Sequence, residues 1–283
     1  MVEQKKILVA LAHPDDESFG MGGTLALYAQ QGAEVHLICA TRGEAGEVDP
    51  QFLEGFSSIA ERREDELRCA AAHLGLREVH FLEYRDSGMQ GSPDNQHPEA
   101  FINAPLEKVT EELVSYIRDF KPQVVLTFDP VGGYHHPDHI HIHNAAVKAF
   151  HAAGDPNFAP NGSQPYQPDK LYFNIFPRGF IRTVVKIIKF FGKDTTKFGR
   201  NQDINLDVLA GDADYPTHVI INYHKVGHLK DKASACHASQ LDFGSQSPSL
   251  VSWLRRISGG KDRFMRAYPP ADEGYKAQDL FAD

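Results

Sequence analysis

The chain has 283 residues, of which 41% are apolar, enough to bury a large core within one enzyme-sized unit. Its formal net charge of −9 speaks against a nucleic-acid-binding protein, because such proteins present a basic surface to the phosphates. The cysteines Cys39, Cys69 and Cys236 lie far apart and form no CxxC pair, so we expect no disulfide framework.

The N-terminal segment MVEQKKILVALAHPDDE indicates a first strand, because its apolar run is short and charged residues follow without a small-residue cleavage site. No window of the sequence approaches the roughly 18 apolar residues that a membrane span needs. We therefore expect a cytoplasmic protein.

Short aliphatic runs alternate with helical patterns through the first half of the chain. The candidate strands are KILVALA, EVHLICAT, EVHFLEY and QVVLTFD. This alternation predicts right-handed βαβ units and a mostly parallel sheet with helices on both faces. We predict a single α/β domain over residues 1–283. Its Rossmann-like doubly wound core spans residues 1–152 and carries the site, and residues 153–283 form an irregular C-terminal elaboration.

The second half of the chain shows weaker patterns. LYFNIF and HVIIN are candidate strands, and HKVGHLKDKASACHASQ indicates a helix. We expect the tail from Ser258 onward to be irregular surface structure, because it holds paired glycines and the segment YPPADEGY.

Polar residues concentrate directly after the four strands of the first half. The four segments are, in order, HPDDE, RGEAGE, YRDSG and DPVGGYHHPDH. In an open parallel sheet the carboxyl ends of the strands share one edge, where ligands bind. The four loops are therefore expected to converge on one site.

The first and last of these loops offer ligands for a divalent metal. A hydrolytic site needs three protein ligands and one open position for water. His13, Asp15 and Asp16 lie on one tight turn, so one aspartate can ligate while the other faces the open position. The third ligand is expected from HHPDH, where Pro137 suits the first turn of a helix and places His136 at its entrance.

Two other interpretations compete with this one. His139 and His143, four residues apart, could share a helical face like half of an HExxH site, although no Glu lies between them. Alternatively, HPDD could be a simple helix-capping turn and the histidine patch an adventitious metal binder. The coincidence of both motifs at one sheet edge favours the catalytic metal site.

The motifs resemble those of the LmbE-like or PIG-L-type zinc deacetylases, which remove acetyl groups from N-acetylglucosamine-containing substrates. The resemblance covers most of the first 150 residues, through AHPDDESFGMGGTLA, TRGEAGE, RREDEL, YRDSGM and GGYHHPDH, with a weaker echo in KASACHASQ. The YRDSGM segment narrows it toward the mycothiol-type deacetylase and amidase branch. A doubly wound α/β fold with a single zinc ion is what this resemblance implies.

Carried over position by position, the resemblance implies that the metal ligands are His13, Asp16 and His139. Asp15 then matches the general base that deprotonates the attacking water. Two histidines and one carboxylate also suit Fe²⁺ or another divalent metal, so zinc is the first choice among several.

Three further residues of the fourth loop match catalytic positions. His136 matches the imidazolium that stabilises the oxyanion or protonates the amine. Asp138 matches the carboxylate that orients this imidazolium. Tyr134 matches a tyrosine that reaches the oxyanion. His135 stands where the family commonly has glycine, which adds a bulky group beside the site.

Three other residues match positions that hold the sugar hydroxyls of the substrate: Glu47, Arg63 and Asp86. Glu47 and Asp86 could instead be loop carboxylates that cap helices. Arg63 lies in the charged run ERREDEL, where an intrahelical ion pair is the ordinary arrangement. Glu17 is expected to support the ligands from behind and not to bind the metal.

Residues 178–200 are basic although the chain is acidic. Arg182, Lys186, Lys189 and Lys193 recur at helical spacing, opposite the apolar stripe Ile181, Val184, Val185, Ile188 and Phe191. We expect a basic amphipathic helix that packs on the domain or forms a homo-oligomer contact. A lid over the pocket is the second option, and contact with an anionic membrane surface the least favoured.

The sequence thus predicts a metal-dependent hydrolase that removes the acetyl group from an N-acetylglucosaminyl small molecule or conjugate, an amino sugar being its expected partner. The alternative is an amidase that cleaves a larger acyl group from a glucosamine conjugate. A metal-dependent binding protein without turnover is disfavoured, because binding alone would not need Asp15, His136 and Asp138 together.

Overall fold

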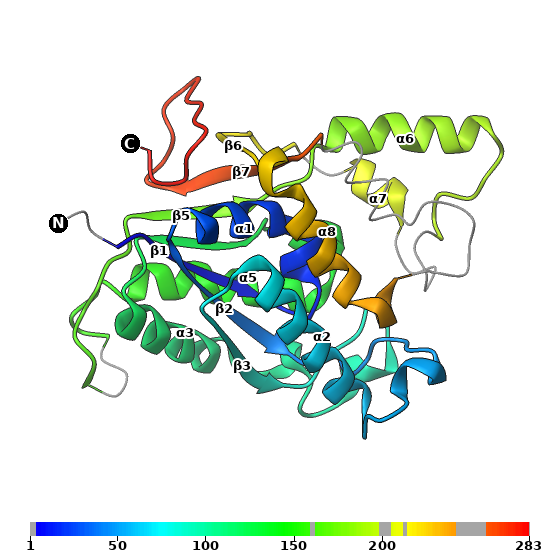
Figure 1. The fold of residues 1–283 in the computed structure, drawn as a ribbon, viewed down its shortest axis with the longest axis horizontal. Helices are drawn as coiled ribbons and strands as arrows, with labels where there is room; N and C mark the ends of the chain where they lie inside the picture. Colours follow the sequence, from blue (N-terminus) through cyan, green and yellow to red (C-terminus); the bar gives the residue numbers. More distant parts are fainter. Residues whose placement is uncertain (1–3, 159–161, 198–204, 212–213, 242–258, 283) are drawn as a thin grey trace.

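The computed structural model describes residues 4–158, 162–197, 205–211, 214–241 and 259–282. Its described strands form one seven-stranded sheet in the order β3-β2-β1-β4-β5-β7-β6 (Figure 1). The strands are β1 (Lys6–Leu11), β2 (Glu34–Thr41), β3 (Glu78–Tyr84), β4 (Val124–Phe128), β5 (Lys170–Asn174), β6 (Val219–Asn222) and β7 (Lys261–Tyr268). Neighbours from β3 to β5 pair in parallel, whereas β7 runs antiparallel to both β5 and β6.

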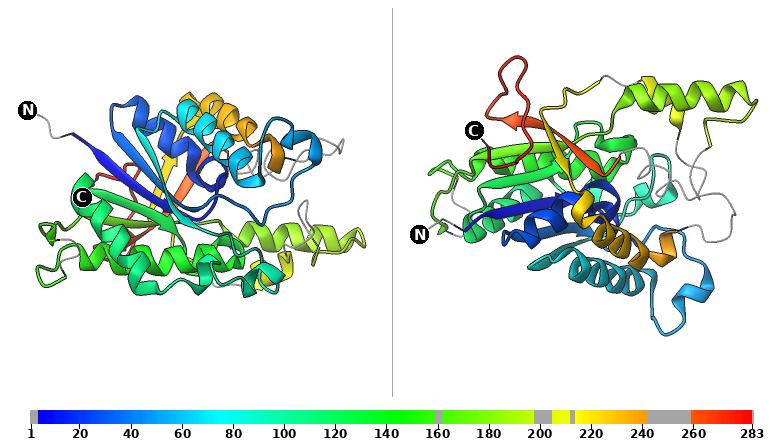
Figure 2. Two further views of the ribbon diagram at one scale, coloured as in Figure 1. Left: turned by 90° about the horizontal axis from the view of Figure 1, so that it is seen from below. Right: turned by 45° about the horizontal axis from the view of Figure 1, so that its top comes forward.

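Helices cover both faces of the sheet, as Figure 2 shows. The helices α1, α2 and α8 pack together on one face, and α3 and α5 pack together on the other. The bounds are α1 (Gly22–Gln30), α2 (Ile59–Leu74), α3 (Leu106–Phe120), α4 (Gly132–His135), α5 (Pro137–Ala152), α6 (Arg178–Phe190), α7 (Leu206–Gly211) and α8 (Gly227–Cys236). The prediction of a doubly wound, mostly parallel α/β fold is confirmed.

The central strands are buried on both faces, which explains their unbroken apolar sequences. All residues of β4 are buried, as are those of β1 after Lys6.

The helix α2 shows how local sequence signals set the ends of a helix. The Ser58 side chain accepts a hydrogen bond from the Glu61 N–H at its start, and Gly75 ends it with a φ of 75° that favours glycine.

The expectation of irregular structure after Ser258 is wrong for Lys261–Tyr268, which forms β7 between β5 and β6. Alternate residues of this strand are buried, including Asp262, Phe264 and Arg266. The Asp262 carboxylate accepts hydrogen bonds from the backbone N–H and the hydroxyl of Thr24, both at 2.8 Å. The C-terminal part of the chain is therefore tied to the start of α1.

The expectation that the chain lacks disulfides is also wrong. Cys69 of α2 is joined to Cys236 at the end of α8. The two residues are 167 positions apart and meet only because the two helices pack against each other. Cys39 is the free, buried cysteine.

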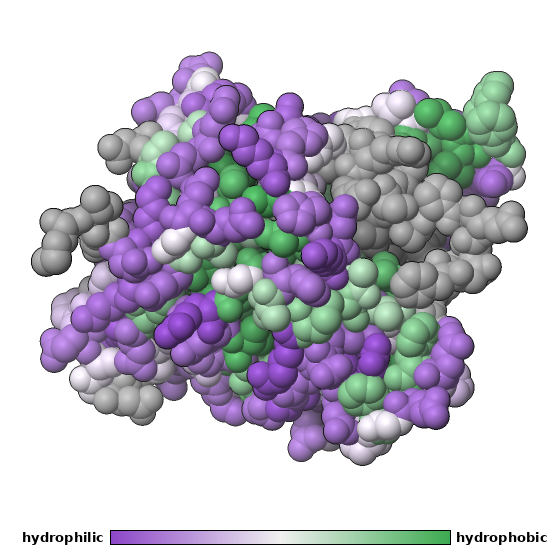
Figure 3. All heavy atoms as spheres, in the orientation of Figure 1, coloured by the Kyte–Doolittle hydropathy of each residue, from purple (hydrophilic) through white to green (hydrophobic). Residues whose placement is uncertain are grey.

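The basic segment forms α6, and its residues 198–200 lie outside the described part of the chain. Val184 and Val185 are buried as predicted, but Phe191 is 69% exposed and does not belong to the buried stripe. Ile187, Phe190 and Phe191 are exposed. Figure 3 shows apolar surface over α6. No helix of the described residues is long and apolar enough to cross a membrane.

Candidate metal centre

The loops after β1 and β4 meet where the doubly wound sheet changes direction. Strand β1 pairs with β2 on one side and with β4 on the other. The chain leaves β1 toward α1 on one face and leaves β4 toward α5 on the opposite face. Both loops therefore lie at the carboxyl ends of the strands, at the usual ligand position in this architecture.

Three side chains from these loops bring their donor atoms together. The Nδ1 atom of His13 lies 3.1 Å from Nε2 of His139. The Asp16 carboxylate spans the two nitrogens, with Oδ2 3.6 Å from the first and Oδ1 3.3 Å from the second. Two ligands of one tetrahedral zinc ion lie about 3.3 Å apart, given zinc–nitrogen bonds of about 2.0–2.1 Å. The spacing of the three residues fits a single divalent ion.

The hydrogen bonds on the far sides of the two rings fix their tautomers. Nδ1 of His139 lies 3.1 Å from the carbonyl oxygen of Gly132, which can only accept, so this nitrogen carries the proton. Nε2 of His13 faces the carboxylates of Asp138 at 3.2 Å and Asp86 at 3.3 Å, and carries the proton for the same reason. Two lone pairs and one carboxylate consequently face one point, an arrangement that a cation stabilises.

The electrostatics of the cluster show which groups carry charge when no metal is bound. Burial works to raise the pKa of Asp16, but the neighbouring His139 and His13 hold it well below its usual value, so the carboxylate is ionised. Burial also works to lower the pKa of His13, but the carboxylates of Asp86, Asp138 and Asp16 outweigh it and raise the pKa well above its ordinary value. The ring must therefore release its Nδ1 proton when it binds a metal. The centre therefore has an excess of negative groups.

Asp15 lies beside these ligands in a constrained conformation. Its φ of 120° is one that non-glycine residues rarely adopt. The Arg63 side chain donates to its carboxylate at 3.1 Å, and its backbone N–H donates to Glu17 at 3.0 Å. Burial raises the pKa of Asp15 to about 6, against the lowering effect of Arg63. This value suits a group that accepts and releases a proton near neutral pH.

Arg63 is buried, with 4% of its surface exposed. Besides Asp15, it donates to the carbonyl oxygens of Gly43 at 3.1 Å and Pro14 at 2.5 Å. Neither a solvated charge nor an intrahelical ion pair describes it. The side chain ties the loops after β1 and β2 together, and its assignment to a sugar hydroxyl remains a prediction.

His237, on the turn after α8, supports the same loop from behind. Its Nε2 lies 2.8 Å from Glu17, both side chains are fully buried, and Glu17 in turn accepts from the Asp15 backbone. The support role expected for Glu17 agrees with these contacts. The sequence signal for His237 is weak: it lies 220 positions from Glu17, within the segment KASACHASQ that carries only the weaker part of the resemblance.

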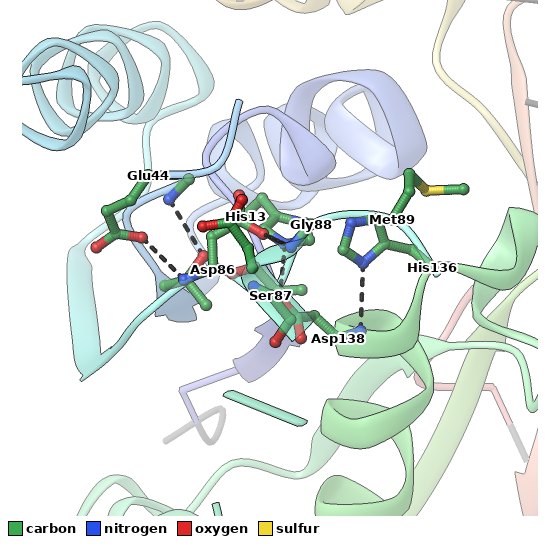
Figure 4. Close-up of polar contacts among 12 residues, drawn as sticks. His13, Glu44, Asp86, Ser87, Gly88, Met89, His136 and Asp138 are labelled. Atoms are coloured by element: carbon green, nitrogen blue, oxygen red, sulfur yellow. Dashed lines mark hydrogen bonds and ion pairs between the residues drawn. The ribbon is translucent and has the colours of Figure 1, made fainter. Parts of the chain in front are cut away.

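His136 caps the N-terminus of α5, as its place before Pro137 predicts. Its Nδ1 accepts from the Asp138 N–H at 3.2 Å, so the neutral ring carries its proton on Nε2 (Figure 4). Burial, together with the nearby His13 and His139, lowers its pKa well below the ordinary value, and the ring is neutral here. Nitrogen atoms of His13, His136 and His139 lie within 4.8 Å of one another, so His136 is a further possible ligand beside the three assigned above.

The Asp138 carboxylate contacts the ring of His13 and not that of His136, which the resemblance assigns to it. It is fully buried between Nε2 of His13 and the Ser87 N–H, at 3.2 and 2.9 Å (Figure 4). Its contact with His136 is made by its backbone N–H alone. The physical reason is that the first turn of α5 directs the side chain toward β1. Asp86 likewise contacts His13, and its pKa lies far below its usual value despite burial, chiefly because of His13.

The remaining predicted residues lie around this centre. The Tyr134 ring lies 5.0 Å from His139 and 6.0 Å from His136 between centroids, and packs against the cluster formed by α6 and α7. Glu47 is exposed on the loop after β2, where its carbonyl oxygen accepts from Gln240. The competing His139–His143 pair is not supported, because no group of potential metal ligands among the described residues contains His143.

Comparison with known proteins agrees with this geometry. A family model described as PIG-L, GlcNAc-PI de-N-acetylase, matches residues 8–150. The chain is 42% identical to a 1D-myo-inositol 2-acetamido-2-deoxy-alpha-D-glucopyranoside deacetylase of Streptomyces scabiei, with 98% of this chain and 88% of the relative aligned. The chain belongs to the PIG-L family. A relative of the same description from Thermobifida fusca is 40% identical over 99% of this chain and all of its own length.

The PIG-L fold is also found among solved structures. The N,N'-diacetylchitobiose deacetylase from Pyrococcus horikoshii superimposes with a TM-score of 0.63, at 23% identity, over 93% of this chain and 84% of the other. At this identity the likeness concerns the fold. The chain thus shares its α/β architecture with this structurally characterised protein.

Proposed function

We propose that this chain is a zinc-dependent N-deacetylase that hydrolyses the acetamido group of an N-acetylglucosaminyl small molecule. The first candidate substrate is the glucosaminyl-inositol compound named for the relatives that align over nearly the full chain. The observation that carries the proposal is the set of converging donors on His13, Asp16 and His139, with Asp15 beside them.

The donor set fits a divalent ion, which would be held by His13, Asp16 and His139. When bound, such an ion polarises the acetyl carbonyl and makes water a stronger acid near neutral pH. The carboxylates of Asp86 and Asp138 keep the His13 ring in the tautomer that ligation requires. Zinc is proposed over Fe²⁺ because the reaction needs no redox chemistry.

The protein side chains supply the remaining steps of amide hydrolysis. Asp15 takes a proton from water as the oxygen bonds to the acetyl carbon. The Nε2–H of His136 and the Tyr134 hydroxyl then donate to the carbonyl oxygen as negative charge develops on it. Cleavage of the carbon–nitrogen bond releases acetate, and the proton held by Asp15 is delivered to the departing amine.

The substrate contacts proposed for Glu47, Arg63 and Asp86 differ in their physical basis. Glu47 is exposed and free to meet a sugar hydroxyl. Arg63 and Asp86 are buried and already hold Asp15 and His13, so their effect on the sugar would be indirect. Steady-state kinetics of the variants therefore distinguishes a direct contact with the sugar from an indirect effect. Glu47→Gln should raise KM, whereas Asp86→Asn should lower kcat.

The test of the proposal is acetate release by the zinc-loaded protein from N-acetylglucosaminides that carry inositol, lipid, malate or simple sugar groups. We expect release from at least one, with the inositol compound preferred. Absence of acetate across this set, with release of a larger acyl group from a glucosamine conjugate, would replace the deacetylase by the amidase. Verified metal content without any hydrolysis would leave only a binding function.

A further inference from the structure

A second cluster of metal-binding side chains lies on α2 and α8, apart from the His13 centre. Cys69 and His73 are four residues apart on α2 and so share one helical face. Cys236 ends α8, which packs against α2. The sulfur and nitrogen atoms of the three residues lie within 4.8 Å of one another. Two thiolates and one imidazole are ligands that zinc readily accepts.

The two sulfurs are joined in the structure, but their surroundings leave the bond open to reduction. Cys69 is exposed on the outer side of α2, and Cys236 is partly exposed. Attack by a small thiol reductant breaks the sulfur–sulfur bond and leaves one thiol and a mixed disulfide. A second reductant thiol then releases the other cysteine, so that the protein gains two electrons and two protons and the reductant becomes a disulfide.

Contacts independent of the disulfide keep Cys236 beside α2. The next residue, His237, is fully buried with its Nε2 2.8 Å from Glu17. Two residues further on, the backbone N–H and hydroxyl of Ser239 donate to Glu66 of α2 at 2.8 and 2.7 Å. Since these buried bonds do not depend on the sulfur–sulfur bond, its reduction leaves both thiols close together.

The backbone spacing suits a shared ion. The Cα atoms of Cys69 and Cys236 are 5.9 Å apart. Two sulfur ligands of one tetrahedral zinc ion lie about 3.8 Å apart, given zinc–sulfur bonds of about 2.3 Å. Rotation of the two side chains opens the sulfurs to that distance without displacing the helices. His73 is exposed on the same surface and can approach without entering the core.

We propose that Cys69, His73 and Cys236 form a second zinc site in the reduced protein, and that the disulfide is the metal-free, oxidised form of the same site. Binding displaces the two thiol protons to solvent and leaves the fourth position to water. The site is distinct from the His13 centre, whose described donors include no cysteine.

Cobalt titration of the full-length protein tests this inference without an activity assay. Cobalt bound to thiolate has a charge-transfer absorption in the near ultraviolet that histidine and carboxylate sites lack. We expect the band to appear on titration of the reduced protein and to saturate at one equivalent. Zinc content should rise from one ion per chain in the oxidised protein to two in the reduced protein.

Variants identify the ligands. Cys69→Ser should abolish the band and the second zinc ion, and His73→Gln should shift the titration to higher cobalt concentrations. His228→Gln, which changes another exposed histidine outside the cluster, is the matched control. Equal zinc content in both redox states, a reduced protein without the thiolate band, or a His73→Gln titration identical to that of the control would overturn the proposal.

Discussion

The guanidinium of Arg63 lies 3.1 Å from the carboxylate of Asp15, across the gap between α2 and the loop after β1. Arg63 is buried and the Asp15 side chain is 18% exposed, and Arg63 works against the burial that raises the pKa of Asp15. The position and the protonation of the proposed base therefore depend on a residue of a different element.

Arg63→Lys should lower kcat by about 10–100-fold while KM stays near its original value, because a residue that only positions a catalytic group does not bind substrate. A lysine has one charged nitrogen and cannot serve the Pro14, Gly43 and Asp15 oxygens together. Arg68→Lys on the exposed side of the same helix is the control. A raised KM with unchanged kcat would show instead that Arg63 contacts the sugar.

Gly43→Ala tests the same arrangement from the loop side. A Cβ atom at this position would lie 2.0 Å from a guanidinium nitrogen of Arg63, so the side chain would have to move. Gly55→Ala is the matched control, because Gly55 also has a positive φ but nothing within 4 Å of a Cβ atom. Both variants share a backbone cost of about 1–2 kcal/mol. Only Gly43→Ala should lose turnover, and equal kcat values in the two variants would contradict the account.

Glu17→Gln should disturb Asp15 while leaving the metal ligands in place. The Glu17 carboxylate accepts from the Asp15 N–H, the Ser18 hydroxyl and His237, and an amide nitrogen cannot accept. A buried donor left without an acceptor costs about 1–3 kcal/mol of unfolding free energy. Thermal unfolding should show a lower Tm, and kcat should fall. The zinc content per chain should stay unchanged. Glu99→Gln, at an exposed position, serves as reference. A loss of zinc would assign Glu17 to the ligand set.

The four strand-end loops could be predicted from sequence because strand–helix alternation places the carboxyl ends of parallel strands at one edge. His13, Asp16 and His139 converge for that reason, although His139 lies more than a hundred residues after the other two. Strand β7 was missed because KDRFMRAY does not alternate polar and apolar residues. Its buried face holds the charged residues Asp262 and Arg266 beside Phe264, and these find partners only in the folded chain.

Other features depend on how elements pack, which local patterns do not contain. The Cys69–Cys236 bond reflects the packing of α8 on α2. The charged run around Arg63 favoured an intrahelical ion pair and the resemblance a sugar contact, yet two of its acceptors are carbonyls of other loops. The side-chain direction of Asp138 follows from the first turn of α5 against β1, so the sequence could identify the residue but not its partner.

Removal of metal should lower both stability and activity. Zinc at 100 times its Kd should add about 2.7 kcal/mol to the free energy of unfolding relative to the metal-free protein, because it binds the native state. His139→Asn should abolish most of this difference, since it removes a converging lone pair. Thermal unfolding with and without a chelator measures it. An equal Tm for the chelated and zinc-loaded wild type would contradict the assigned ligands.

Acetate release by zinc-loaded Asp15→Asn, measured beside the wild type with zinc content determined in the same samples, tests the central claim most directly. The side chain keeps its size, and the ligands His13, Asp16 and His139 are untouched. The account predicts full zinc content and a kcat lower by about 10²–10⁴-fold, because the group that accepts the proton of water is gone. A variant that contains zinc and releases acetate at the wild-type rate would contradict it.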